Sequence, residues 1–174
     1  MSVKITKAKL TPYNTLEVVF TETIAKPEGG TIDNEVTKKC KGIAHSDLTG
    51  AFAKLRPHLV ILCEQPEAAE LLQIDEMSDE SIEEVVSAYN VSSFSLGKNG
   101  EGITISGSKD LKSGKVLNLN NPHQELDGSY IWEPYLSVAR EKLLDEVEMY
   151  LNGKEAEAAQ GKLPLEDGND DDDM

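Results

Sequence analysis

The sequence has few of the features that mark secreted, membrane-spanning or disulfide-bonded proteins. It contains two cysteines among 174 residues, too few for a disulfide framework in a chain of this size. Its longest apolar run, Leu59 to Cys63, is far shorter than a membrane span, and no apolar stretch follows the first lysines as it would in a signal peptide. Aromatic residues make up only 5% of the chain. These absences favour one cytoplasmic domain in a reducing compartment.

The net charge of −15 is unevenly distributed along the chain. Residues 61–90 carry nine acidic and no basic residues, and the last ten residues carry six acids. In contrast, residues 1–60 have nine Lys or Arg against six acids, and residues 91–120 have four lysines against two acids. Two weakly basic segments therefore lie within an acidic protein, and this asymmetry bears on the kind of partner that the protein binds.

The first part of the chain predicts strands. Val3 to Glu22 is rich in β-branched and aromatic residues around Pro12-Tyr13-Asn14, which predicts two strands and a turn. The composition of residues 25–34 predicts a loop, and a third strand is expected over Glu35 to Ile43.

Helices are expected next. Ser46 is a candidate N-cap for a helix that Pro57 should kink or split, since proline cannot donate a backbone hydrogen bond. The apolar stripe of this helix has steps of three and four residues and comprises Leu48, Phe52, Leu55, Leu59 and Leu62. Residues 66–72 could form another helical turn or two, and Ser78 is a candidate N-cap for an acidic helix reaching about Tyr89.

Strands and a final helix complete the pattern. Strands are expected over Val91–Leu96, Gly102–Ser108 and Lys115–Leu119, joined by turns that contain glycine. Pro134 fits the first position of the last helix and Gly153 the position after its end. The expected apolar face of this helix comprises Leu136, Ala139, Leu143, Val147, Tyr150 and Leu151.

The order of elements predicts an α+β domain over residues 1–154. We expect an OB-like antiparallel barrel or sheet of five or six strands, with a helix between the third and fourth strands and a helix at the C-terminal end. Residues 155–174 are rich in Ala, Glu, Gln, Gly and Asp, a composition that predicts a disordered acidic tail.

No pattern in the sequence predicts catalysis or a cofactor. The three histidines, His45, His58 and His123, stand in no nucleophile motif, so we expect a protein that is not an enzyme. Cys40, His45, His58 and Cys63 are spaced poorly for zinc, and a buried Cys63 is the favoured interpretation. His123, Glu125 and Asp127 could bind a divalent ion, although a solvated loop is the favoured alternative.

Lysines with interspersed aromatic residues characterise the two basic segments. Proteins that bind single-stranded nucleic acids combine such a basic surface with aromatic stacking platforms. Lysines on the solvent face of half-buried strands, with the aromatic residues in the core, are the alternative. The candidate binding residues are Lys4, Lys7, Lys9, Tyr13, Phe20, Lys38, Lys39, Lys41, Phe94, Lys98, Lys109, Lys112 and Lys115.

The acidic C-terminal segment is the most specific feature. It includes Asp170, Asp171, Asp172 and Asp173, and a terminal block of like charge is typical of an interaction tail. An acidic tail after a domain with this element order resembles the layout of phage and bacterial single-stranded DNA-binding proteins, although this tail ends in Met174 rather than in an aromatic residue. The resemblance implies that the tail recruits replication or recombination proteins and competes with DNA for the basic surface.

The sequence thus predicts a single-stranded DNA-binding accessory protein, of a phage or prophage replication or recombination system. The alternative is an acidic protein-interaction module, a nucleic-acid mimic or an inhibitor of a host protein that does not bind DNA. No metal or other cofactor is expected in either case.

Overall fold

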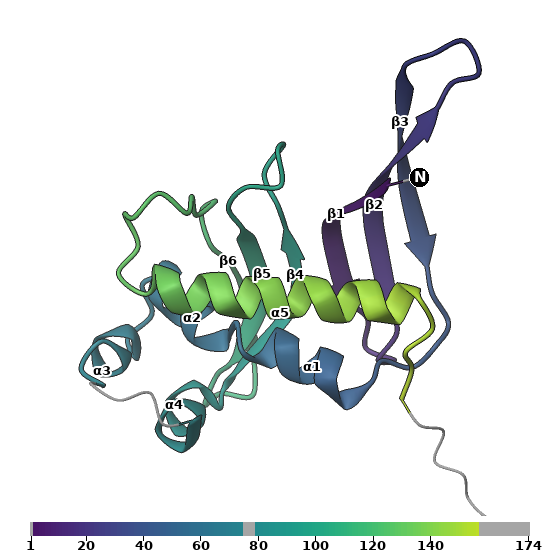
Figure 1. Cartoon of the computed structure of the whole chain (residues 1–174). Coiled ribbons are helices and arrows are strands. Elements are labelled where there is room, and N and C mark those ends of the chain that lie inside the picture. Colours follow the sequence, from purple (N-terminus) through teal and green to yellow (C-terminus); the bar gives the residue numbers. More distant parts are fainter. Residues whose placement is uncertain (1, 75–78, 157–174) are drawn as a thin grey trace, which may run out of the picture.

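The structure is a computed structural model that describes residues 2–74 and 79–156 (Figure 1). Its six strands form one antiparallel sheet in the order β3-β2-β1-β4-β5-β6. They are β1 (Ser2–Leu10), β2 (Leu16–Ala25), β3 (Thr31–Lys39), β4 (Tyr89–Ser95), β5 (Thr104–Asp110) and β6 (Val116–Asn120). β1, β2 and β3 form one half of the sheet and β4, β5 and β6 the other, and the two halves join where β1 pairs with β4.

Helices cover one face of this sheet. The five helices of the described residues are α1 (Ser46–Ala53), α2 (Arg56–Leu62), α3 (Ala68–Leu71), α4 (Asp79–Val86) and α5 (Glu133–Leu151). In Figure 1, α5 crosses in front of the strands, and it contacts β1 and α1, while α1 and α2 contact β4. We call this side of the sheet the covered face and the opposite side the open face.

The core forms between the helices and the covered face. Ala8, Val18, Phe94 and Ile105 lie side by side on β1, β2, β4 and β5, and all four are buried. Phe94 packs against Phe52 of α1, with 5.9 Å between the ring centroids. Because apolar side chains alternate with polar ones along each strand, only one face of the sheet is apolar enough to bury.

The α+β class, the six antiparallel strands and the C-terminal helix agree with the sequence-based prediction. The sheet is open, because no pairing joins β3 to β6 among the described strands. Within the described residues, the four helices α1 to α4 lie between β3 and β4.

Several predicted boundaries were wrong. Residues 31–34 belong to β3 rather than to a loop, because the hairpin turn needs only residues 26–30. Tyr89 begins β4 instead of ending a helix, since it pairs with Lys109. The N-cap of α1 is His45, whose Nδ1 accepts a hydrogen bond from the Asp47 amide at 3.0 Å. The predicted split near Pro57 is present: α1 ends at Ala53, α2 begins at Arg56, and Pro57 lies in the first turn of α2.

The final helix and the residues after it tie the two halves of the chain together. Tyr150 of α5 donates a hydrogen bond from its hydroxyl to the Gly42 carbonyl at 2.5 Å and accepts one from the Leu16 amide at 3.3 Å. The amide of Ala156 donates to the Ile43 carbonyl at 2.8 Å. The fold therefore extends two residues beyond the predicted boundary at residue 154. The rest of the predicted tail, and Ser78, lie outside the described residues.

Candidate nucleic-acid interface

Polar and charged side chains occupy the open face. Across β1, β4 and β5, Lys9 lies beside Ser93 and Ser93 beside Ser106, while in the neighbouring row Lys7 lies beside Ser95. By the same strand alternation, the half of this face formed by β4, β5 and β6 is lined mainly by small uncharged polar residues, with Asp110 and Val116 at its end. The small uncharged polar residues are Asn90, Ser93, Ser95, Thr104, Ser106, Ser108, Asn118 and Asn120.

A β-bulge places three lysines of β1 on the open face. Ile5 pairs with Phe20 and Lys7 with Val19, so Thr6 is an extra residue opposite β2. The bulge lets Lys4 and Lys7, three positions apart, project to the same side as Lys9. The hydroxyl of Thr6 donates to the Val19 carbonyl at 3.1 Å and holds the bulge. Lys7 and Lys9, two positions apart, are then about 6.7 Å from each other along the strand.

A matching bulge occurs in the adjacent strand β4. Val91 pairs with Gly107 and Ser93 with Ser106, which leaves Ser92 as the extra residue. The Ser92 hydroxyl donates to the Ser106 carbonyl at 3.3 Å. This bulge keeps Val91 and Phe94 on the covered face and turns Ser93 and Ser95 to the open face. The two bulges explain why neither strand shows a regular alternation in its sequence.

Further lysines lie at one end of the sheet. Lys39 pairs with Glu17, and Glu17 pairs with Lys9. These three side chains therefore form a row of alternating charge across β3, β2 and β1 on the open face. The antiparallel order brings to this end the turns that carry Tyr13, Lys112 and Lys115, together with Lys41 after β3. The side chains of Lys41, Lys112 and Lys115 are exposed, and Tyr13 is 84% exposed.

Five of the predicted residues lie elsewhere. Phe94 and Phe20 project to the covered face, and Phe94 is only 1% exposed. Lys109 also lies on the covered face, where its Nζ bonds both carboxylate oxygens of Glu67, at 2.9 and 3.2 Å. Lys38 pairs with buried Val18 and so projects to the covered side, and exposed Lys98 lies in the loop at the opposite end of the sheet. Phe94 and Lys109 are therefore unavailable for stacking on bases or binding phosphate in this structure.

The sequence reasoning followed charges and aromatic rings, and for that reason it missed the uncharged residues of the open face. A period-two pattern of Ser, Thr and Asn was present in residues 104–108 and 118–120 and could have identified them.

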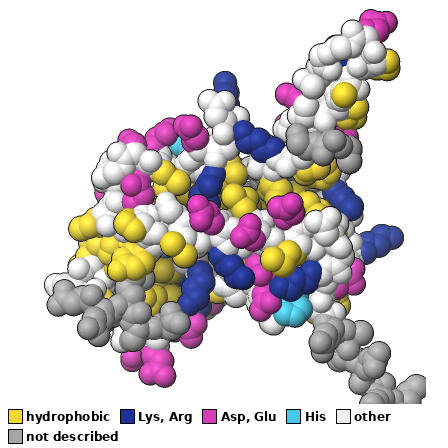
Figure 2. All heavy atoms as spheres, viewed as in Figure 1, with side chains coloured by type: hydrophobic (Ala, Val, Ile, Leu, Met, Phe, Trp, Pro, Cys, Tyr) yellow, Lys and Arg dark blue, Asp and Glu magenta, His cyan; other side chains and the backbone are white. Residues whose placement is uncertain are grey.

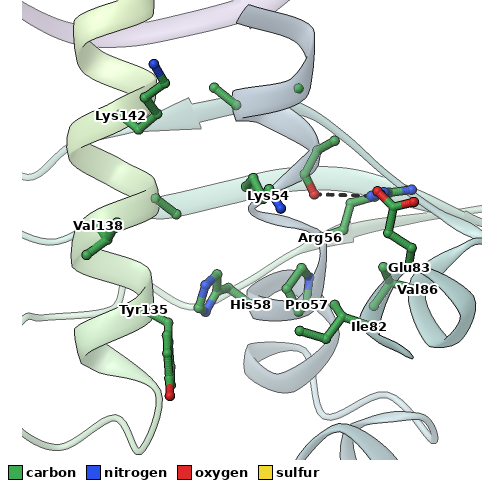
Figure 3. A pocket seen from close by; sticks show the side chains of 14 residues that line it. Lys54, Arg56, Pro57, His58, Ile82, Glu83, Val86, Tyr135, Val138 and Lys142 are labelled. Atoms are coloured by element: carbon green, nitrogen blue, oxygen red, sulfur yellow. Dashed lines mark hydrogen bonds and ion pairs between the residues drawn. The ribbon is translucent and has the colours of Figure 1, made fainter. Parts of the chain in front are cut away.

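The helix side of the molecule contains a pocket. In Figure 2, which views this side, acidic, basic and hydrophobic side chains are intermixed. The pocket, of about 520 Å³, lies between α1, α2, α4 and α5, and Figure 3 shows His58 of α2 facing α5, with Ile82, Glu83 and Val86 of α4 on the other side. At its rim, Arg56 pairs with Glu83 at 3.6 Å and Lys142 with Glu146 at 2.9 Å.

His58 has a structural role beside this pocket. Its Nδ1 is 2.8 Å from the Tyr130 hydroxyl, and its ring packs edge-on to Trp132. Burial lowers the pKa of His58 to about 4, because a charged imidazolium would be poorly solvated there. The ring is therefore neutral at neutral pH.

Of the other candidate metal ligands, His123 and Glu125 lie near each other, with 3.8 Å between Nε2 and Oε1. Among residues 2–74 and 79–156, no three His, Cys, Asp or Glu side chains cluster as a metal site would require. His123 Nδ1 is 3.1 Å from the Thr104 hydroxyl, and Asp127 accepts a hydrogen bond from the Ser129 amide. Cys63 is only partly buried, whereas a buried residue was expected, and this partial burial raises the pKa of its thiol.

The chain matched no protein-family model, no curated protein and no solved structure. No helix within the described ranges is long and apolar enough to cross a membrane. Asp170 to Asp173 lie outside those ranges.

Proposed function

We propose that this protein binds single-stranded DNA across its open face, as an accessory protein of phage or prophage replication or recombination. The observation that carries the proposal is the placement of Lys4, Lys7 and Lys9 on one uncovered face by the bulge at Thr6. Each ammonium group can pair with a backbone phosphate, and each pairing releases a counterion.

The uncharged residues of the face suit contacts with bases and sugars. Ser and Asn side chains both donate and accept hydrogen bonds, so they tolerate different bases. The described part of the open face has no aromatic ring, and Tyr13 at its end is the available stacking platform. We therefore expect affinity to depend mainly on phosphate contacts and to fall steeply with salt.

An OB-like identity of the core is part of the proposal. It is supported by the position of α1 to α4 between β3 and β4, where an OB barrel has its helix. The acidic tail would regulate access to the face, as the resemblance to single-stranded DNA-binding proteins implies.

The test compares two variants of equal charge. Lys4, Lys7 and Lys9 are replaced together by Gln, and in the control Lys26, Lys38 and Lys98 are replaced by Gln, because those exposed lysines lie off the open face. Binding of a fluorescent single-stranded oligonucleotide is measured by anisotropy at about 50 mM and about 200 mM salt. The first variant should bind more weakly, and its salt slope should fall by about 2, since each lost phosphate contact removes about 0.7.

The control should retain most of the wild-type affinity. Equal losses in both variants would show that only net charge matters and would overturn the proposed face. If the wild-type protein binds no single-stranded DNA at low salt, the DNA-binding proposal is wrong and the acidic interaction module becomes the leading function.

A further inference from the structure

The outer edge of β3 has hydrogen-bonding groups without partners. The Cys40 amide donates to the Leu16 carbonyl at 2.9 Å, and the Lys26 amide donates to the Gly30 carbonyl at 3.0 Å. Bonded pairs alternate in an antiparallel ladder, so the even-numbered residues of β3 bond to β2. The amides and carbonyls of residues 31, 33, 35, 37 and 39 consequently point away from the sheet.

Nothing in the described structure covers this edge. Figure 1 shows β3 as the outermost strand, with the helices on the covered face rather than beside it. All nine residues of β3 except Val36 are exposed. An uncovered edge of this length is a template for pairing with another strand.

Charge is segregated along the same edge. The first half of β3 carries Asp33 and Glu35, whereas Lys39 and then Lys41 follow at the other end. Asp33, Glu35, Thr37 and Lys39 alternate along β3 and project to the open face, and Lys41 follows two residues after the end of the strand. A strand protected from pairing by lysine would repel every approach along its length, but this strand offers both signs of charge.

We propose that β3 pairs antiparallel with β3 of a second copy of this chain across a twofold axis. Thr37 then lies opposite Thr37 of the second copy, Glu35 opposite its Lys39, and Asp33 opposite its Lys41. Opposite charges directly across a strand pair are favourable. The odd-numbered residues that oppose each other are those whose backbone groups are free, so they complete each other's hydrogen bonds.

Other pairings fit less well. A register shifted by two residues on each strand sets Glu35 opposite Glu35, which is repulsive. A register shifted by one residue on each strand keeps one kind of opposite-charge pair, Asp33 with Lys39 or Glu35 with Lys41, instead of two. Pairing of β3 with the other edge strand, β6, offers no complementary charge, because Val116 to Asn120 contains no charged residue. The symmetric arrangement forms one continuous sheet of two copies, with both open faces on the same side. The proposal does not depend on nucleic-acid binding.

A charge-swap experiment tests the interface. One variant carries Asp33→Lys and Glu35→Lys, the other Lys39→Glu and Lys41→Glu. Each alone places like charges opposite each other and should sediment as a monomer, whereas an equimolar mixture restores every opposite pair and should form a heterodimer. Sedimentation velocity gives the mass, and native mass spectrometry identifies the mixed species.

A crosslink tests the register. With Cys40 and Cys63 replaced by serine, Thr37→Cys should form a symmetric disulfide on oxidation, because directly opposed residues have Cα atoms about 5.5 Å apart. Val36→Cys is the control, since residue 36 would oppose Lys38 of the second copy. A wild-type protein that remains monomeric at tens of micromolar, or a mixture that stays monomeric, would overturn the proposal. These outcomes are independent of any DNA-binding result.

Discussion

The two faces of the sheet are built from alternate residues of the same strands, yet they differ in almost every physical property. On the covered face, Phe94 and Ile105 pack under α1 and α2, whereas on the open face their neighbours Ser93 and Ser106 form a polar row with Lys9. Burial stabilises the first face, while exposed polar groups on the second leave it free to contact a partner. One sheet can therefore separate stability from recognition.

The largest expected effect is on the free energy of unfolding, and it should differ sharply between two neighbouring residues of β4. Phe94→Ala should lower the free energy of unfolding by about 3–5 kcal/mol, because it leaves a cavity against Phe52. Ser93→Ala, one position away on the open face, should change it by less than about 0.5 kcal/mol. Urea titrations followed by circular dichroism measure both. Similar losses in the two variants would show that the open face is also structurally constrained.

The next largest expected effect is a dependence of the free energy of unfolding on pH, caused by the buried His58 of α2. The pKa of His58 is about 4 in the folded protein because of burial, compared with about 6.5 when the chain is unfolded. As pH falls below 6.5 the unfolded chain gains a proton that the folded chain does not, so stability should drop by about 3 kcal/mol between pH 6.5 and pH 4.

Comparison with a His58→Gln variant isolates this contribution. Urea unfolding at a series of pH values should show a shallower decline for the variant than for the wild-type protein. Parallel declines would mean that His58 accepts a proton while the protein is folded.

Periodicity and turn chemistry predicted most of the elements because these signals are local. The Pro12-Tyr13-Asn14 turn, the split at Pro57 and the start of α5 beside Pro134 all agree with the structure. The start of β3 could not be predicted in this way. Its polar residues, among them Asp33 and Asn34, have low strand propensity, and they form a strand only because β2 pairs with them.

The placement of site residues depended on non-local pairing. Nothing in the sequence around Thr6 shows that it is an extra residue, because a bulge is defined by the partner strand. Glu146 was likewise absent from the expected buried face of α5. It is only 1% exposed, and burial alone would raise its pKa, but hydrogen bonds from Lys142 and Lys154 outweigh that effect and lower the pKa. Lys154 comes from beyond the helix, so no periodic pattern includes it.

The smallest expected effect concerns the acidic C-terminal segment and the open face alone. Residues 165–174 carry six acidic side chains, and this polyanionic segment would compete with DNA for the lysines of β1. Deleting these residues should tighten binding to single-stranded DNA a few-fold at low salt and leave it nearly unchanged at high salt, where such competition is screened. The unfolding free energy should not change, because the covered face is untouched.

A second variant separates charge from length. Replacing the six acids by Asn and Gln keeps the segment at full length, so it should reproduce the tighter binding if charge is the cause. Combining this change with Lys4→Gln, Lys7→Gln and Lys9→Gln should abolish the gain, since the tail would have no lysines to compete for. If the combined variant still binds DNA more tightly than the protein with the acidic segment intact, the binding surface lies elsewhere than on the open face. The difference between the two faces would then explain the stability of the protein but not its function.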